Sequence, residues 1–358
     1  MKNSTAIVLG LLTLSATVGA QTTQSIFPLL PPSVSTIPSN GDLNPYGVVI
    51  VPKTIAPGNG LQPGDILVSN FNDGNNLQGL GTTILRVNAA GNVSTFYTSS
   101  LQNRGLTAAL GVLSDGLVLI GNLPTADGTP ATIQPGNFSV LDRFGDFLGT
   151  FGTSSSVQGP WGMAVYDSGN GVTGNAYVFI SNVLNGTVSR FLLSYNATSI
   201  LSSVITLATG FNHRLDPAAL VLGPSGLAYS PSNDTLYVAS SADNAIYQIP
   251  TATSAGSAVT PLLLVQDATH MHGPLDLAIL PDGHFVVANS DGSNTDPNQP
   301  SELAEYSATG AFLAQMSVDP NNGGAFGLAV YNVGWGTIRM AYVDDNSNTL
   351  NIRTTVVP

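Results

Sequence analysis

The chain has 358 residues, no cysteine and a net charge of −12; only 8% of its residues are charged, while 43% are hydrophobic. This composition excludes disulfide bonds and thiolate metal sites, and it is not that of a disordered or collagen-like chain. Lys and Arg together number nine. Nucleic acids and anionic membrane surfaces are therefore disfavoured as partners, because both are bound through basic side chains.

The N-terminal residues are typical of a secretory signal. Lys2 supplies a positive charge, residues 6–14 form an apolar core, and residues 18–20 (VGA) make a small-residue cleavage site. We therefore expect a signal peptide over residues 1–20 and a single domain over residues 21–358, secreted to the extracellular space or periplasm as a monomer. No later apolar stretch is long enough for a membrane-spanning helix.

A repeated pattern of strands follows along the rest of the chain. Each unit contains an apolar strand that ends in a small residue and then Asn, Ser or Asp, and these ends lie 52, 60, 58, 49 and 55 residues apart. In chain order the six strands are residues 65–70, 117–122, 177–182, 235–240, 284–289 and 339–344.

Another apolar strand precedes each of these, usually introduced by Pro-x-Gly. The clear examples begin at Pro45, Pro160, Pro224 and Pro274, and weaker versions begin at Ala109 and Ala325. Turn sequences with Asp-Gly, such as residues 114–116 and 281–283, separate the two strands. Each unit therefore begins with an antiparallel pair.

The strand pattern predicts the architecture. Continuously apolar strands are buried on both faces, and no helical pattern interrupts them. Six units of about 56 residues predict an all-β fold, a six-bladed β-propeller with four-stranded antiparallel blades around a central channel. We expect the segment around residues 26–37 to add the outer strand of the last blade and so close the ring. A β-sandwich is the alternative, but its strands do not normally repeat at this period.

The units resemble those of NHL-type six-bladed propellers. That repeat reads Pro-x-Gly-hydrophobic-Ala, then a turn with Asp-Gly, then a strand ending in Val-Ala-Asp, and residues 274–289 (PLDLAILPDGHFVVAN) match it nearly throughout. Residues 69–74 and 159–164 also resemble exported bacterial propellers of no known activity. The resemblance covers nearly all of residues 21–358. It implies the fold and says little about function, since propellers host many functions.

In such propellers the strand ends lie on one rim of the central channel. The resemblance thus implies a ring of polar side chains there, namely Asn70, Asn122, Asn182, Ser240, Asn289 and Asp344. Calcium-dependent propellers of the gluconolactonase and paraoxonase type bind their metal at this rim, and amide and carboxylate oxygens suit calcium. Those enzymes also use a glutamate early in the chain, whereas the first glutamate here is Glu302. This difference argues against a lactonase.

The ring has two interpretations. In one, Asn70 and Asn122 bind a ligand, and a calcium site is formed by Asn182, Asn289, Asp291 and Asp344. The spacing of acidic and amide residues over 344–348 is also that of the first half of a calcium loop, without its glycine and distant glutamate. In the other interpretation, these side chains cap strand ends and bond to turn backbone, as Asn and Asp often do.

Three histidines suggest a different metal site. His270 and His272 face the same side of an extended segment, and His213 lies in the preceding connection between blades. If the blades keep register, the three imidazoles gather on one rim, where they would suit zinc or copper. The alternative is histidines in surface loops that bind no ligand. His284 lies within a strand and is expected to pack in the core.

Aromatic residues occupy corresponding places at the starts of three units, and they are Tyr46, Trp161 and Phe326. They are candidates for an aromatic channel mouth that binds a sugar or an apolar ligand; the alternative is packing between blades. No Gly-x-Ser-x-Gly motif, P-loop or dinucleotide fingerprint occurs, so nucleophilic catalysis and nucleotide binding have no support.

The sequence therefore predicts a binding module that recognises a carbohydrate, a small molecule or an extracellular protein at one rim. A calcium-dependent, or zinc- or copper-dependent, hydrolase or lyase is the alternative, and a scaffold without a small-molecule site is a third. Convergence of Asn182, Asn289 and Asp344 on one point would favour the enzyme. The same side chains bonded to nearby turns would favour binding or scaffolding.

Overall fold

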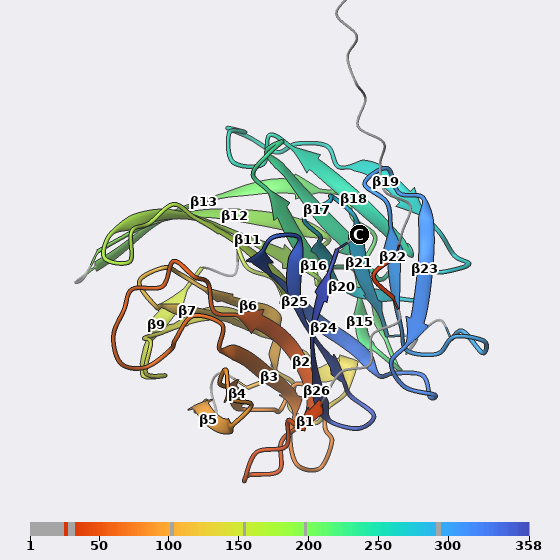
Figure 1. Ribbon diagram of the computed structural model, residues 1–358, viewed down its shortest axis with the longest axis horizontal. Coiled ribbons are helices and arrows are strands. Elements are labelled where there is room, and N and C mark those ends of the chain that lie inside the picture. The colour runs from red at the N-terminus through yellow and green to blue at the C-terminus, as the bar shows by residue number, and fades with distance from the viewer. Residues whose placement is uncertain are drawn as a thin grey trace, which may run out of the picture.

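The computed structural model describes residues 25–27, 33–100, 104–152, 155–196, 199–290 and 295–357. Six four-stranded antiparallel sheets stand around a common axis, which confirms the predicted six-bladed propeller (Figure 1). The one helical element in these ranges is a short 3-10 turn, η1 (Pro130–Thr132). No helix among the described residues has the length and apolar character needed to cross a membrane. The expected signal peptide lies outside the described residues.

The first three blades follow one another in chain order, each running from the channel outward. Blade 1 contains β2 (Leu43–Ile50), β3 (Ile66–Asn72), β4 (Thr83–Val87) and β5 (Val93–Thr98). Blade 2 contains β6 (Leu106–Val112), β7 (Val118–Asn122), β8 (Asn137–Leu141) and β9 (Phe147–Phe151). Blade 3 contains β10 (Pro160–Asp167), β11 (Gly174–Asn182), β12 (Thr187–Asn196) and β13 (Ser199–Thr209).

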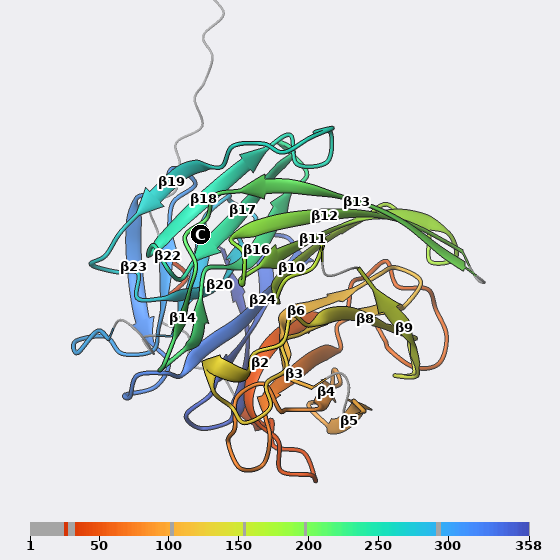
Figure 2. The same ribbon diagram turned by 180° about the vertical axis from the view of Figure 1, so that it is seen from behind.

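The last three blades complete the ring. Blade 4 contains β16 (Pro224–Ser230), β17 (Thr235–Ser240), β18 (Ala245–Pro250) and β19 (Leu262–Gln266). Blade 5 contains β20 (Pro274–Ile279), β21 (Phe285–Asn289), β22 (Glu302–Tyr306) and β23 (Phe312–Ser317). Blade 6 contains β24 (Ala325–Gly334), β25 (Thr337–Asp344), β26 (Thr349–Val356) and β1 (Ser33–Ser35). Between blades 3 and 4 the chain adds a hairpin, β14 (Arg214–Asp216) and β15 (Leu220–Leu222) (Figure 2).

The ring closes through the N-terminal strand. β1 pairs antiparallel with β26, with Ser33 opposite Asn351 and Ser35 opposite Thr349. Blade 6 therefore takes three strands from the C-terminal end of the described chain and one from the N-terminal end. This confirms the predicted closure by the segment that precedes the first full blade.

A second contact holds the N-terminal segment on blade 5. The Ser25 hydroxyl and the Ile26 N–H both donate to Oε2 of Glu305, at 2.6 and 3.0 Å. The other carboxylate oxygen lies 3.0 Å from Nδ1 of His284, which also lies 3.3 Å from Asp282. Glu305 is 0% exposed and His284 is 1% exposed. The prediction that His284 packs in the core is confirmed, although its partner is a carboxylate.

The turns between first and second strands form where Asp-Gly predicts them. In blade 2, Gly116 adopts a φ of +96°, which only glycine adopts readily. The Leu113 N–H donates to the Leu117 carbonyl, and the Asp115 carboxylate accepts the Leu117 N–H. Gly283 of blade 5 has a φ of +90° in the corresponding turn. These hairpins set the register of the two strands nearest the channel.

The glycine of Pro-x-Gly allows the inner strands of neighbouring blades to approach closely. A Cβ atom at Gly327 would lie 2.1 Å from the Tyr46 carbonyl oxygen, and one at Gly162 would lie 2.2 Å from that of Ser225. Blade 5 differs, because Asp276 follows Pro274 at this place. The motif therefore specifies contact between blades rather than a turn.

We predict that Gly327→Ala destabilises the ring. The new methyl group collides with backbone of blade 1, so two blades must separate, at a cost of about 1–3 kcal/mol or more in the free energy of unfolding. Urea denaturation measures the change. Gly256→Ala is the matched control, since a Cβ there meets nothing within 4 Å, and it should be neutral or slightly stabilising. Equal stability of both variants would contradict the close-approach explanation.

Large apolar side chains fill the space between the blades. Between blades 2 and 3, one cluster includes Leu119, Phe138, Val178 and Phe191, each at most 1% exposed. Burial of each such side chain contributes about 1.5–3 kcal/mol of hydrophobic stabilisation. With no disulfide present, packing of this kind holds the blades in place and fixes the rim on which the candidate sites lie.

Candidate functional site

The strand-end amides of blades 2 and 3 bond to nearby loops and to their own third strands. Oδ1 of Asn182 accepts the Gln158 N–H at 3.0 Å, and its Nδ2 donates to Ser189 at 2.9 Å. Oδ1 of Asn122 accepts the Asn137 N–H at 2.8 Å. Both side chains therefore cap strands, as the second interpretation of the ring expects.

The equivalent amides of blades 1 and 5 make closely matched contacts. Nδ2 of Asn70 donates to the Thr36 carbonyl and to the Thr83 hydroxyl, both at 3.1 Å. Nδ2 of Asn289 donates to the His270 carbonyl and to Oε1 of Glu302, both at 2.8 Å. Each amide thus joins the preceding connection to the first residue of the third strand.

The strand ends of blades 4 and 6 bond within tight turns. Ser240 donates to Asp243, and the Asp344 carboxylate accepts the hydroxyl and the N–H of Ser347. Burial raises the pKa of Asp344. Asp291 lies outside the described residues. Asn182, Asn289 and Asp344 therefore bond within three separate blades and not to a shared centre.

A second set of residues directly follows the strand ends. These residues are Phe71, Leu123, Val183, Ser241, Ser290 and Asp345. Successive side chains of an extended segment point in opposite directions, so these side chains point away from those of the strand ends. The first three lie in one apolar cluster, whereas Ser290 and Asp345 line a pocket. The residues that follow the strand ends are therefore apolar in blades 1–3 and polar in blades 4–6.

The three predicted aromatic residues meet at the channel mouth. Tyr46 stacks on Phe326, with ring centroids 4.9 Å apart, and meets Trp161 edge-on at 5.3 Å. Phe71 contacts both Tyr46 and Trp161, at 5.2 and 5.4 Å. Leu220, from the extra hairpin, packs into the same cluster. Trp161 is 1% exposed and does not line the adjoining pocket, so it packs behind Tyr46 rather than offering a binding surface.

A pocket of about 260 Å³, hereafter the mouth pocket, lies on the polar side of this floor. Tyr46 and Phe326 form its aromatic part. Its polar wall carries amides and one carboxyl, from Asn44, Asn72, Asn76, Gln78 and Asp345. Ala218 and Ala219, at the tip of the extra hairpin, border the pocket on another side.

The electrostatics of the mouth pocket centre on Asp345. Burial, and then the neighbouring carboxylate of Asp344, raises the pKa of Asp345 to about 7. Burial, with Asp345 and Asp276 nearby, also raises the pKa of Tyr46 well above its usual value. Near pH 7 the carboxyl of Asp345 is thus present in both forms, able to donate or accept a hydrogen bond. Oδ1 of Asn72 is buried without a hydrogen-bond partner among the described residues.

A second cavity, of about 240 Å³, lies among the inner strands of the channel. Apart from Asp276, the residues that line it are glycine or have apolar side chains. The two oxygens of this carboxyl accept the N–H groups of Leu277 and of Leu328 in the next blade, at 2.9 and 3.0 Å. Burial outweighs these bonds and raises the pKa of Asp276 to about 7.

The structure gives the three predicted metal-binding histidines different partners. His213 lies 3.2 Å from the Phe211 carbonyl. Nδ1 of His270 lies 2.8 Å from Asp267, and its ring stacks on Phe312. Within the described parts of the chain, neither His213 nor His270 belongs to a group of three potential metal ligands.

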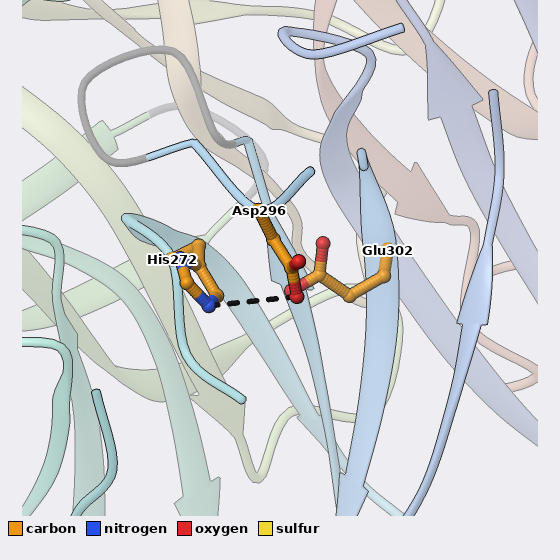
Figure 3. A group of neighbouring side chains, drawn as sticks. All are labelled: His272, Asp296 and Glu302. Atoms are coloured by element: carbon orange, nitrogen blue, oxygen red, sulfur yellow. Dashed lines mark ion pairs between the residues drawn. The ribbon is translucent and has the colours of Figure 1, made fainter. Parts of the chain in front are cut away.

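His272 does belong to such a group, together with Asp296 and Glu302 (Figure 3). We call these three residues the blade-5 cluster. Their side chains point toward one another, with one ligand atom from each residue lying within 4.8 Å of the others. Nε2 of His272 lies 3.7 Å from Asp296 and 3.2 Å from the Thr269 carbonyl. The three residues are 8%, 6% and 0% exposed in chain order.

Sequence reasoning missed Asp345, Ser290, Asp296 and Glu302. The first two directly follow predicted strand ends, so the repeat locates them along the chain, but it does not say which side chains line a pocket. Glu302 was noted only as a late glutamate, although the blade repeat puts it beside Asn289. Asp296 lies in an irregular connection, and no sequence signal fixes its position.

Comparison with known proteins bears on the fold. No family model matches the chain, and no curated protein matches it. Among solved structures it is similar to the calcium-binding protein regucalcin from Agrobacterium tumefaciens, at 13% identity, with a TM-score of 0.54 over 90% of this chain and 96% of that one. It is also similar to an auxiliary nutrient binding protein from Bacteroides ovatus (12% identity, 88% and 70% covered, TM-score 0.51) and a gluconolactonase from Xanthomonas campestris (12%, 90% and 97%, 0.50). These similarities support the propeller fold, and membership of the NHL family stays a prediction.

Proposed function

We propose that the protein is an exported binding module whose mouth pocket holds a small, neutral, hydroxyl-rich molecule, a carbohydrate of about monosaccharide size. The observation that carries this proposal is the composition of the pocket. An aromatic floor of Tyr46 and Phe326 faces a wall of amides and a single carboxyl. Apolar and aromatic surface with a few placed polar groups is the usual design of a small-molecule site.

Size and charge narrow the ligand class. A cavity of about 260 Å³ is smaller than most pockets for drug-sized ligands. Its lining contains no Lys or Arg, so it offers no charge for a phosphate or a carboxylate. Amides, the Tyr46 hydroxyl and the half-protonated Asp345 both donate and accept hydrogen bonds. Sugar hydroxyls do the same, and this match favours a neutral polyol.

The contacts of the strand-end residues favour binding over metal-dependent hydrolysis. Asn182, Asn289 and Asp344 are engaged in their own blades. The one carboxyl in the pocket lining is Asp345, whereas calcium usually takes six to eight oxygen ligands. A calcium-dependent hydrolase at this mouth, our second candidate, would have to rely on the amides of Asn44, Asn72 and Asn76 for most of its ligands.

Isothermal titration calorimetry with a panel of neutral monosaccharides tests the proposal. We expect at least one sugar to bind and Asp345→Asn to weaken its affinity by about tenfold, the loss of a hydrogen bond of about 1.5 kcal/mol. The exposed Asp146→Asn, which removes the same charge far from the lining, should leave affinity unchanged. Absence of binding by every sugar, or equal binding by Asp345→Asn, would refute the carbohydrate site. Turnover of lactones or esters that requires added calcium would support the second candidate.

A further inference from the structure

We propose that the blade-5 cluster is a binding site for a zinc-type divalent metal ion and that this ion holds residues 295–301, which include Asp296, against β22. The site is separate from the mouth pocket, since none of His272, Asp296 and Glu302 lines that pocket. The inference does not depend on the proposed carbohydrate site.

The geometry is that of three converging donors. One imidazole nitrogen and two carboxylate oxygens lie within 4.8 Å of one another, nearly buried, and they come from three separate segments. His272 precedes β20, Asp296 lies in the connection after β21, and Glu302 begins β22. Small side-chain rotations would bring all three atoms to the distance of about 2.0–2.2 Å at which zinc takes such ligands.

Two acidic groups this close favour a cation between them. Removing two acidic side chains from water is costly unless another charge compensates them. A divalent ion bound by both carboxyl groups would supply that charge. Its nitrogen ligand would be Nε2 of His272, which lies 3.7 Å from Asp296.

Comparison among the six blades shows that the fold does not require these residues. The places equivalent to Glu302, at the start of the third strand, hold Thr83, Asn137, Thr187, Ala245 and Thr349. The places equivalent to His272 lie two residues before the first-strand residue that pairs with the strand end, and they hold Leu43, Arg104, Gln158, Leu222 and Gly323. Blade 5 alone combines an imidazole with an acid at these two places, although all six blades fold alike.

The side-chain contacts of Asn289 also distinguish blade 5 from blade 1. Its Nδ2 makes the same two kinds of contact as that of Asn70, with Glu302 in place of Thr83. Both partners of Nδ2 are acceptors, which fixes the amide orientation. Its Oδ1 is then left buried, at 0% residue exposure, with no hydrogen-bond partner among the described residues. Because the Asn289 side chain already contacts Glu302 through Nδ2, this oxygen is a potential fourth ligand.

The donor set selects the metal. Calcium binds oxygen ligands and would leave the imidazole of His272 unused. A set of one imidazole and two carboxylates suits zinc, and with lower preference manganese. Burial of all three side chains indicates a closed, structural site, since catalytic zinc sites keep one position open.

Metal analysis of the purified full chain tests this inference. After equilibration with zinc and dialysis, plasma mass spectrometry should find one zinc ion per chain, and Glu302→Gln and Asp296→Asn should each lose it. Zinc at 100 times its dissociation constant should raise the Tm of the wild type by about 4 °C and leave that of both variants unchanged. His270→Gln is the matched control. It removes the neighbouring imidazole, which lies outside the cluster, and should keep the ion.

Cobalt(II) supplies a test that needs no variant. Bound to one nitrogen and two or three oxygens in a closed site, it should show the visible absorption of a four-coordinate ion, and zinc should remove that absorption. Absence of stoichiometric zinc and of any shift in Tm would overturn the proposal. Retention of zinc by Glu302→Gln, or a response to calcium alone that Asp345→Asn abolishes, would also overturn it by placing the metal elsewhere.

Discussion

Glu305→Ala should lower the free energy of unfolding by about 3–5 kcal/mol, the usual cost of removing one partner from a buried charged network. Its carboxylate is fully buried, and Oε2 is the acceptor for both the Ser25 hydroxyl and the Ile26 N–H. The alanine variant removes that acceptor and one of the two carboxylates beside His284. Guanidinium denaturation of wild type and variant measures the loss.

Two further variants separate the network from simple loss of volume. Glu305→Gln keeps the shape and one acceptor oxygen, so its loss should be intermediate. Ser25→Ala removes two hydrogen bonds, one to Glu305 and one from the Phe27 N–H, and should cost about 2 kcal/mol. If Glu305→Ala costs no more than Ser25→Ala, the carboxylate does not hold the N-terminal segment in the way its contacts indicate.

The free energy of unfolding should also fall as the pH rises from 5 to 8. Asp276 and Asp345 each have a folded-state pKa of about 7, whereas an unfolded Asp has one near 4. Between these values the folded state holds protons that the unfolded state has released, so stability decreases with pH until both carboxyls ionise near pH 7. Each pKa unit corresponds to about 1.36 kcal/mol.

For Asp276 the expected fall is about 2 kcal/mol between pH 5 and pH 8, after allowance for solvent screening in the channel cavity that its carboxyl borders. Asp345 adds less, because it lies in an open pocket. Asp234 and Asp267 have lowered pKa values. The stabilisation that these two carboxylates provide is complete above about pH 4, so it does not change between pH 5 and pH 8.

Urea denaturation at pH 5 and pH 8 tests this expectation. Asp276→Asn cannot ionise, so its fall between the two pH values should be smaller by about 2 kcal/mol. At pH 5 it should be less stable than wild type by about 1 kcal/mol, because an amide offers only one oxygen to the Leu277 and Leu328 N–H groups. Asp146→Asn, an exposed change of the same charge, should follow the wild type. A parallel pH profile for Asp276→Asn would show that this carboxyl is not the titrating group.

The sequence predicted the fold better than the site, and the repeat explains why. Apolar strands, Asp-Gly turns and Pro-x-Gly recur at a period that leaves six blades as the natural solution, and β1 closes the ring as expected. The strand ends were also placed correctly along the chain, since Asn70, Asn182 and Asn289 each close a second strand or lie near its end.

The positions of the strand ends could be predicted from the sequence, but the directions of their side chains could not. A strand pattern gives alternation but does not say which set faces the axis. The amides of Asn182 and Asn289 bond to nearby backbone and side chains. In blades 5 and 6 the residues that line the mouth pocket are the next ones along the chain, Ser290 and Asp345. The blade-5 cluster could not be predicted for a different reason. Asp296 lies outside any strand, so no strand pattern places it beside His272.

The short closing strand has a consequence for how the chain folds during synthesis. β1 is made before any blade, but its partner β26 is among the last segments to be made. Blades 1–5 can assemble from neighbouring segments, whereas blade 6 must await a contact between distant parts of the sequence, which is slow to form. Until then β26 presents an unpaired edge open to other chains. The last step of folding is therefore a competition between pairing of β1 with β26, which closes the ring, and aggregation through the free edge of β26. The N-terminal segment is bound to Glu305, and this contact keeps β1 at a high local concentration.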